Sequence, residues 1–304
     1  MKFDTHQIIE QLEEIFTFKN PECENLNTLA NDVVEVTTPT GHFALKLYNP
    51  ASRKANEIQW EIELTLHLIT NGVLVAKPIV GKNGYLNTFM IDGQERVGVL
   101  FEWADGEKPK PEKTTYVLLG KAAGLIHQAA DSFRSSISRE KYDASILIDE
   151  QLKRMHAPLV ASGQLERVVD LSERLRKLIT NPNLDWGICH MDLTLDNVHR
   201  SGDILTVFDF DSAGESWRAV EPYGVLRFSE EYFKAWLEGY RSVRKFSKDD
   251  EKAVAVFGVV EDIRNVVWKL GLARSSRGEP LLQVAELPRV VDEWLEWEQS
   301  KINR

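Results

Sequence analysis

One segment of the chain concentrates side chains that could carry out chemistry. Asp192 and Asn197 lie five residues apart in a polar stretch, and Asp209 directly follows the short apolar run 204–208. Carboxylate and amide oxygens are the ligands that Mg²⁺ prefers, and a carboxylate can also orient an attacking hydroxyl group and accept its proton. Phosphoryl transfer needs both functions, so these three side chains predict a site for a magnesium-bound triphosphate.

The same residue types also have a purely structural use, because Asp and Asn side chains often bond to nearby backbone in turns. We retain the turn interpretation for Asp196. The joint spacing of the three residues with His190 and Asp211 is hard to obtain from turns and favours a catalytic site. His190 is expected to organise its loop rather than act as the base, and Asp211 either binds a second Mg²⁺ or holds its own loop.

The motif His-x-Asp-x-x-x-x-Asn at 190–197, followed by Asp-Phe-Asp at 209–211, resembles the catalytic and metal loops of a known family. This is the aminoglycoside phosphotransferase and choline kinase-like family, whose members are relatives of the protein kinases. The resemblance implies that Asp192 is the catalytic residue. It also implies that Asn197 and Asp209 hold Mg²⁺ against ATP.

The resemblance covers about residues 26–272, in the family's order of elements. It implies an α+β, protein-kinase-like bilobal fold. Residues 1–103 are then a small antiparallel β-sheet lobe with one long helix, which binds the nucleotide. Residues 104–304 are a larger, mainly helical lobe with the catalytic loop and the acceptor site.

The resemblance also assigns the residues that contact the phosphates. Lys46, on a predicted strand, is implied to reach the α- and β-phosphates of ATP, although a single strand lysine would by itself be an ordinary surface residue. Its expected partner is Glu61, which lies about three helical turns before Gly72. Glu57, one turn earlier on the same helix face, is the alternative.

The connection between the predicted lobes resembles the family's hinge. If so, the Glu102 carbonyl and the Ala104 amide contact the adenine edge, and Phe101 lies beside the ring. Gly120 to His127 similarly resembles the family's first helix of the large lobe, where the histidine is usually structural.

Two features depart from the family pattern. The phosphate-covering loop at 27–32 contains no glycine, so the Thr28 and Asn31 side chains or ordinary amides would have to approach the phosphates. After the Asp-Phe-Asp motif the family often carries a further aspartate near an aromatic pair, and Glu221 occupies that region here. Cys189 is expected to be a small buried hydrophobic residue rather than a nucleophile.

Hydrophobic periodicity predicts the elements that must position these residues. Ser247 and Asp250 form an expected capping box at a helix start. The predicted strands are 32–38 and 42–48, as a hairpin, then 76–80, 85–90, 97–101 and 204–208; the predicted helices are 5–16, 52–70, one after the connector 107–111, then 144–157, 164–180, 229–241, 249–273 and 284–301.

Composition excludes several classes of protein. The chain has 304 residues and a formal charge of −10, which disfavours nucleic acid and anionic membranes as partners. The longest apolar run, 253–260, is much shorter than the ~20 residues of a membrane-spanning helix. The N-terminus does not resemble a secretory signal, and two cysteines are too few for a disulfide framework, so we expect a cytoplasmic protein without structural zinc.

The sequence therefore predicts an ATP- and Mg²⁺-dependent phosphotransferase that acts on a hydroxyl group of a small molecule, such as an aminoglycoside, choline or homoserine. A serine/threonine protein kinase is the alternative within the fold, although no Ala-Pro-Glu motif follows Asp211. A nucleotide-binding regulator without turnover and a metal-dependent phosphohydrolase are alternatives of other classes. The oligomeric state stays open, and the acceptor residues are unranked candidates: Glu230, Glu231, Glu261, Asp262 and Arg264.

Overall fold

The computed structural model describes residues 4–26, 31–50, 53–271 and 280–303. Their contacts divide the chain into two compact units. The first contains residues 1–109, 132–139 and 195–211, and the second contains 110–131, 140–194 and 212–304. The sequence analysis divides the chain once, at 103/104. In the structure the first unit also contains two later stretches of chain, 132–139 and 195–211.

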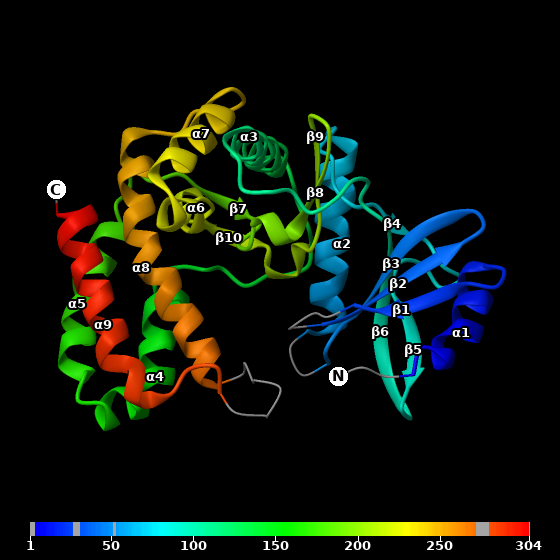
Figure 1. Cartoon of the computed structure of the whole chain (residues 1–304), viewed down its shortest axis with the longest axis horizontal. Helices are drawn as coiled ribbons and strands as arrows, with labels where there is room; N and C mark the ends of the chain where they lie inside the picture. The colour runs from blue at the N-terminus through cyan, green and yellow to red at the C-terminus, as the bar shows by residue number, and fades with distance from the viewer. Residues whose placement is uncertain (1–3, 27–30, 51–52, 272–279, 304) are drawn as a thin grey trace. The chain divides into compact units, whose positions relative to one another are not determined.

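The first unit is built on a six-stranded antiparallel sheet (Figure 1). The strand order is β1-β2-β3-β6-β4, and β5 also pairs with β6. The predicted hairpin is present as β2 and β3, in which Lys46 pairs with Val33. The strand bounds are β1 (Glu22–Asn25), β2 (Asp32–Thr38), β3 (Gly41–Leu47), β4 (Pro78–Ile79), β5 (Asn87–Ile91) and β6 (Gln94–Glu102).

Each face of this sheet is covered by one helix. Helix α1 (His6–Phe16) packs its buried Leu12 into a cluster that includes Leu45 and Leu47. Helix α2 (Ala55–Thr70) packs Ile58 and Ile62 in a separate cluster with Tyr48 and Val99. Because strand side chains alternate between faces, Lys46 lies on the face that α2 covers.

The Asp-Phe-Asp segment reaches the first unit through a small hairpin. Strands β8 (Val198–Ser201) and β9 (Ile204–Val207) pair with each other, and the turn η2 (Leu195–Asn197) precedes them. Val207 exchanges backbone hydrogen bonds with the chain that follows α2: its carbonyl accepts from Ala76 N at 2.9 Å and its N–H donates to Leu74 at 3.0 Å. The end of β9 is therefore attached to the same part of the unit as α2.

The second unit is mainly helical (Figure 1). The longest apolar run of the sequence, 253–260, lies in helix α8, and all of its residues are buried in the core of this unit. Strands β7 (Trp186–Cys189) and β10 (Gly214–Trp217) pair antiparallel. The helices are α3 (Lys113–Ala130), α4 (Glu150–Ala161), α5 (Leu165–Ile179), α6 (Tyr223–Phe228), α7 (Glu230–Arg241), α8 (Lys248–Gly271) and α9 (Leu287–Trp297), with single turns at η1 (Ser145–Asp149), η4 (Arg218–Val220), η5 (Val284–Glu286) and η6 (Glu298–Ile302). The turn η3 (Phe210–Ser212) contains the last two residues of the first unit's segment 195–211.

The expected capping box starts α8. Asp250 N donates to Ser247 Oγ at 3.0 Å, and Ser247 N donates to the Asp250 carboxylate at 3.2 Å. The elements that the sequence analysis did not predict, namely β1, β7, β8, β10 and α6, are four to six residues long. A period of two or 3.6 cannot be recognised over so few residues. Within the described residues, no helix has the length and apolar character needed to cross a membrane.

Two glycines allow α3 and α7 to pack with their backbones in close approach. A Cβ atom at Gly120 of α3 would lie 1.9 Å from the Trp236 carbonyl oxygen, and one at Gly239 of α7 would lie 1.9 Å from the Val117 carbonyl oxygen. Backbone atoms cannot move aside as a flexible side chain can. This contact brings His127 of α3 within 2.8 Å of the Tyr240 hydroxyl of α7.

We therefore expect Gly120→Ala to lower the free energy of unfolding by ~1–3 kcal/mol, because the added methyl group forces the two helices apart. Chemical denaturation measures the change. Gly224→Ala is the matched control, since a Cβ there meets no atom within 4 Å. Alanine is intrinsically the better helix former, so a Gly120→Ala variant as stable as Gly224→Ala would contradict the close packing.

Candidate active site

Lys46 is a buried cation surrounded by carboxylates of the first unit. Its Nζ lies 2.6 Å from Asp209 Oδ1, 3.2 Å from Glu61 Oε1 and 3.8 Å from Asp211 Oδ2. Only 7% of the Lys46 side chain is exposed, and its ammonium also lies over the Tyr48 ring at 4.6 Å. Three elements, β3, α2 and the segment after β9, thus meet at one ammonium group.

The positive charge of Lys46 and the negative charges of its partners stabilise each other's ionised forms. Burial alone would lower the pKa of Lys46, but Asp209, Asp211 and Glu61 together hold that pKa well above its ordinary value. Burial raises the pKa of Glu61, and the nearby Lys46 ammonium opposes that rise. Lys46 therefore stays protonated across the neutral range and presents a fixed positive charge.

The structure separates the two glutamates that the sequence analysis left as alternatives. Glu61 is 2% exposed and pairs with Lys46. Glu57 instead accepts a hydrogen bond from Lys54 N at 2.9 Å at the start of α2, and it lies 3.9 Å from Arg139. Glu57 thus caps its own helix, while Glu61, one turn later, reaches the lysine.

Asp209 and Asn197 are held by the geometry of their loops. Asp209 has φ +67°, a left-handed conformation that costs a residue other than glycine roughly 1–3 kcal/mol and is enriched at functional sites. Its side chain is 39% exposed. Asn197 ends the turn η2, and its carbonyl accepts from Phe208 N at 3.0 Å, which ties the two loops together one residue before Asp209.

The Asp211 segment is fixed by Asn31, a residue of the predicted phosphate-covering loop, and by two arginines that the sequence analysis did not single out. Its carbonyl accepts from Arg53 at 2.8 Å and from Arg139, and its carboxylate accepts from Asn31 Nδ2 at 2.8 Å. The Arg139 side chain is 5% exposed and lies against the Trp60 ring of α2. Arg139 therefore links the loop to the helix that carries Glu61. No local pattern in the sequence could have identified it.

Lys46 and its partners Glu61 and Asp209 line a pocket of about 320 Å³ within the first unit. Lys46, Glu61, Asn197 and Asp209 provide charged and polar groups. The rest of the lining is largely apolar and comes from the sheet and the β8–β9 hairpin: Leu26, Val33, Ala44, Ala76, Phe101, Trp103, Ala104, Phe208 and Phe210 line it, together with Glu102, Thr65, Asp196 and His199. The pocket therefore combines apolar walls with the buried Lys46 ammonium and several carboxylates.

The predicted hinge residues lie along this pocket. Glu102 N donates to the Lys77 carbonyl at 2.8 Å, and Trp103 N donates to His42 at 3.0 Å. The Ala104 carbonyl is 2.7 Å from His199 Nδ1, which ties the hinge to β8. Thr28 and the other residues at 27–30 lie outside the described part of the chain, so the structure describes only Asn31 and Asp32 of the predicted phosphate-covering loop.

Asp192 belongs to the second unit and is exposed. It follows Met191, which has φ +67° and whose N–H donates to Glu221 Oε1 at 2.8 Å. His190 is fully buried, so it does not reach the surface beside Asp192. The loop thus exposes the Asp192 carboxylate, while the two preceding residues, His190 and Met191, are buried.

The acceptor candidates of the second unit differ in their surroundings. Glu261 and Arg264 interact electrostatically with Asp192, and so does Tyr223, whose pKa burial raises to about 12. Arg264 lies 2.7 Å from Glu261 and 3.5 Å from the Met191 carbonyl. Glu230 and Asp262, in contrast, form ion pairs elsewhere, with Lys301 and Arg227 respectively.

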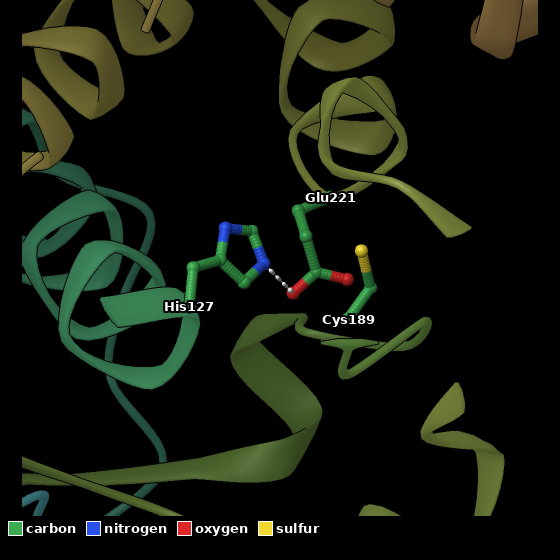
Figure 2. Close-up of side chains that lie close together, drawn as sticks. All are labelled: His127, Cys189 and Glu221. Atoms are coloured by element: carbon green, nitrogen blue, oxygen red, sulfur yellow. Dashed lines mark ion pairs between the residues drawn. The ribbon is translucent and has the colours of Figure 1, made fainter. Parts of the chain in front are cut away.

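A buried cluster in the second unit joins residues that the sequence analysis considered separately. His127, Cys189 and Glu221 point toward one another from α3, β7 and the segment after η4 (Figure 2). His127 Nε2 lies 3.7 Å from Glu221 Oε2. The three positions are far apart in the chain, so no spacing in the sequence indicates the cluster.

Comparison with known proteins agrees with this architecture. A model of the phosphotransferase enzyme family matches residues 24–254. Amicoumacin kinase of Bacillus subtilis is 26% identical over 262 residues, which cover 78% of this chain and 76% of that protein.

Solved structures of similar fold include kinases of small molecules. An amicoumacin kinase in complex with AMP-PNP, Ca²⁺ and Ami has a TM-score of 0.78 at 20% identity, with 99% of this chain and 95% of that chain covered. A microcompartment-associated aminopropanol kinase has a TM-score of 0.76 at 20% identity, with 99% of both chains covered. Because the family model matches well over half of the chain, the protein belongs to the phosphotransferase enzyme family and is a small-molecule phosphotransferase with a protein-kinase-like fold.

Proposed function

We propose that the protein transfers the γ-phosphoryl group of ATP to a hydroxyl group of a small molecule. The observation that carries this proposal is the buried Lys46 ammonium, held by Glu61 and Asp209 in a pocket of about 320 Å³ whose remaining walls are mostly apolar. A nucleotide has the matching division into a flat base and a charged phosphate chain. The similar amicoumacin kinase structure contains AMP-PNP, which supports a nucleotide as the ligand of this pocket.

In this proposal the pocket residues of the first unit bind the nucleotide. Lys46 bonds the α- and β-phosphates, and Glu61 keeps its ammonium group in position. Phe101, Glu102 and Ala104 contact the adenine. Asp209, which contacts Lys46 at 2.6 Å, would hold the metal ion that accompanies the phosphates.

Asn197 and Asp209 fit a magnesium ion by their chemistry. Both offer oxygen atoms, both line the pocket, and hard oxygen donors are what Mg²⁺ requires. When bound, the ion neutralises the charge that develops on the phosphates during transfer. The Ca²⁺ in the amicoumacin kinase complex supports a requirement for a divalent cation.

Asp192 has the catalytic task in the second unit. The acceptor hydroxyl donates its proton to the Asp192 carboxylate as its oxygen bonds to the γ-phosphorus, and the bond to the leaving ADP oxygen breaks. The exposure of Asp192 supports this role, because a small molecule can approach it. Arg264 and Glu261 are the proposed acceptor-binding residues, since Arg264 lies 3.5 Å from the Met191 carbonyl, next to Asp192, and 2.7 Å from Glu261. Tyr223 is proposed with them because it interacts electrostatically with Asp192, Glu261 and Arg264.

We expect Asp192→Ala to lower kcat by ~10²–10⁴-fold, because the acceptor hydroxyl loses its general base. Binding of the nucleotide should persist, since the pocket for it is lined by residues of the other unit. Coupled ADP-release assays and calorimetric titration measure the two quantities. Asp203→Ala, at an exposed position in the β8–β9 turn, is the control that should retain activity. Undiminished turnover by Asp192→Ala would end the assignment.

Asp209→Asn tests the metal site, because it removes the charge with little change of shape. We expect the increase in ATP affinity that Mg²⁺ produces to fall at least about tenfold, whereas ATP binding measured in EDTA should not weaken. Titrations with and without the metal separate these effects. An unchanged response to Mg²⁺ would show that Asp209 is not a ligand.

The acceptor class is tested by a screen for ATP consumption over amino alcohols, aminoglycosides, amino acids and a generic protein substrate. We expect a small hydroxyl compound to accelerate ATP consumption and to be recovered as its phosphate ester. Transfer to the protein substrate alone would favour the protein kinase, and binding without any turnover would favour the regulator. Phosphate release from monoesters without ATP would favour the phosphohydrolase.

A further inference from the structure

One histidine of the pocket that we assign to the nucleotide has no task in the proposed reaction. His199 of β8 lines this pocket, and so does Ala104 of the hinge, residues 101–104. His199 Nδ1 lies 2.7 Å from the Ala104 carbonyl oxygen. A carbonyl oxygen can only accept a hydrogen bond, so Nδ1 carries the hydrogen atom and donates it. The ring therefore occupies a backbone acceptor at the wall of the pocket.

Aromatic neighbours hold the His199 ring in this orientation. The ring meets Phe208 edge to face, with centroids 5.1 Å apart and an angle of 82° between the planes. It also packs against Trp103 at 5.7 Å, and Trp103 in turn stacks on His42 at 4.2 Å. Turning the Nδ1–H away from the hinge would break these ring contacts as well as the hydrogen bond.

The chain that follows the hinge is bonded to the same strand. Glu107 N donates to the Arg200 carbonyl at 3.2 Å, and Arg200 N donates to the Glu107 carbonyl at 2.8 Å. Gly106 permits this approach, because its φ is +95° and a Cβ atom there would lie 2.2 Å from the Arg200 carbonyl oxygen. The hinge is thus attached to β8 at Ala104 and again three residues later, which fixes the direction of its polar groups.

Adenine and guanine present different groups to such a hinge. Adenine offers an amino donor next to a ring nitrogen that accepts, and these match the Glu102 carbonyl and the Ala104 N–H that we propose as its contacts. Guanine carries a carbonyl oxygen in place of that amino group, and its own donors lie further along the same edge. It therefore needs a second acceptor from the hinge, and the Ala104 carbonyl is a backbone acceptor in the same pocket.

We propose that His199 selects ATP over GTP, because its Nδ1–H occupies the Ala104 carbonyl that guanine would need. A guanine donor that leaves water and finds no acceptor loses its hydrogen bonds without replacement, which costs affinity. Adenine loses nothing, since its edge does not use this carbonyl. The inference rests on the proposed function for its ligand, a purine nucleoside triphosphate, but it involves neither the phosphoryl acceptor nor turnover.

His199→Phe tests the inference by nucleotide binding alone. Phenylalanine keeps an aromatic ring beside Trp103 and Phe208 but has no N–H, so the Ala104 carbonyl becomes available to guanine. Calorimetric titration with Mg²⁺ present measures the Kd of ATP and of GTP. We expect the wild-type protein to bind ATP at least about 30-fold more tightly than GTP, and this ratio to fall about tenfold in the variant, mainly through tighter binding of GTP.

His42→Phe is the matched control. The His42 ring also stacks on Trp103, but its Nε2 lies 2.7 Å from Glu35 and the residue is not part of the pocket wall. The ratio of the two Kd values should therefore stay within about twofold of the wild-type ratio. His199→Leu is measured as well, because it exposes the same carbonyl with a smaller side chain and should lower the ratio even where phenylalanine does not fit.

Three outcomes would overturn the inference. Equal affinity of the wild-type protein for ATP and GTP would show that the hinge does not discriminate between them. An unchanged ratio in both His199→Phe and His199→Leu would give the selectivity another source. An equal fall in His42→Phe would assign it to ring stacking rather than to the hydrogen bond. Selective ATP binding that depends on His199, without transfer to any acceptor, would instead contradict the proposed function alone.

Discussion

The arrangement of the first unit depends on a single buried ammonium group. Lys46 is enclosed by the sheet and α2, and its charge is compensated only because Glu61, Asp209 and Asp211 converge on it. A lone buried lysine would lose its proton, and three carboxylates at this spacing would repel one another without it. The strand, the helix and the loop after β9 are therefore fixed relative to each other by the same interaction that places a buried cation in the pocket.

Left-handed backbone occurs in both loops that carry the proposed site residues. Asp209 and Met191 each have φ +67°, and each is secured by a charged group: the Asp209 side chain by Lys46, and the Met191 amide by Glu221. Conformations of this kind persist only where surrounding contacts impose them. In each unit, therefore, a buried charged side chain bonds to a loop residue with left-handed backbone: Lys46 to Asp209, and Glu221 to Met191.

The contacts of two later segments explain why they belong to the first unit. The hairpin of β8 and β9 packs within the first unit, and so does the segment 132–139, whose Arg139 bonds the Asp211 carbonyl and lies on Trp60 of α2. Asp209 contacts Lys46 of β3, so the loop that carries Asp209 has to pack within the first unit. Arg139 and Arg53 supply that anchor from two other parts of the chain.

The sequence by itself determined the family resemblance, the spacing of Asp192, Asn197 and Asp209, the hairpin that carries Lys46 and the long helices, because motifs and periodicity are local properties of a chain. It could not choose between Glu57 and Glu61, which share a helix face. Only tertiary structure decided that Glu57 caps α2 while Glu61 meets the lysine. It alone brought Glu221 to His127 and Arg139 to Asp211, since contacts between distant residues follow from how elements pack, which no local pattern records.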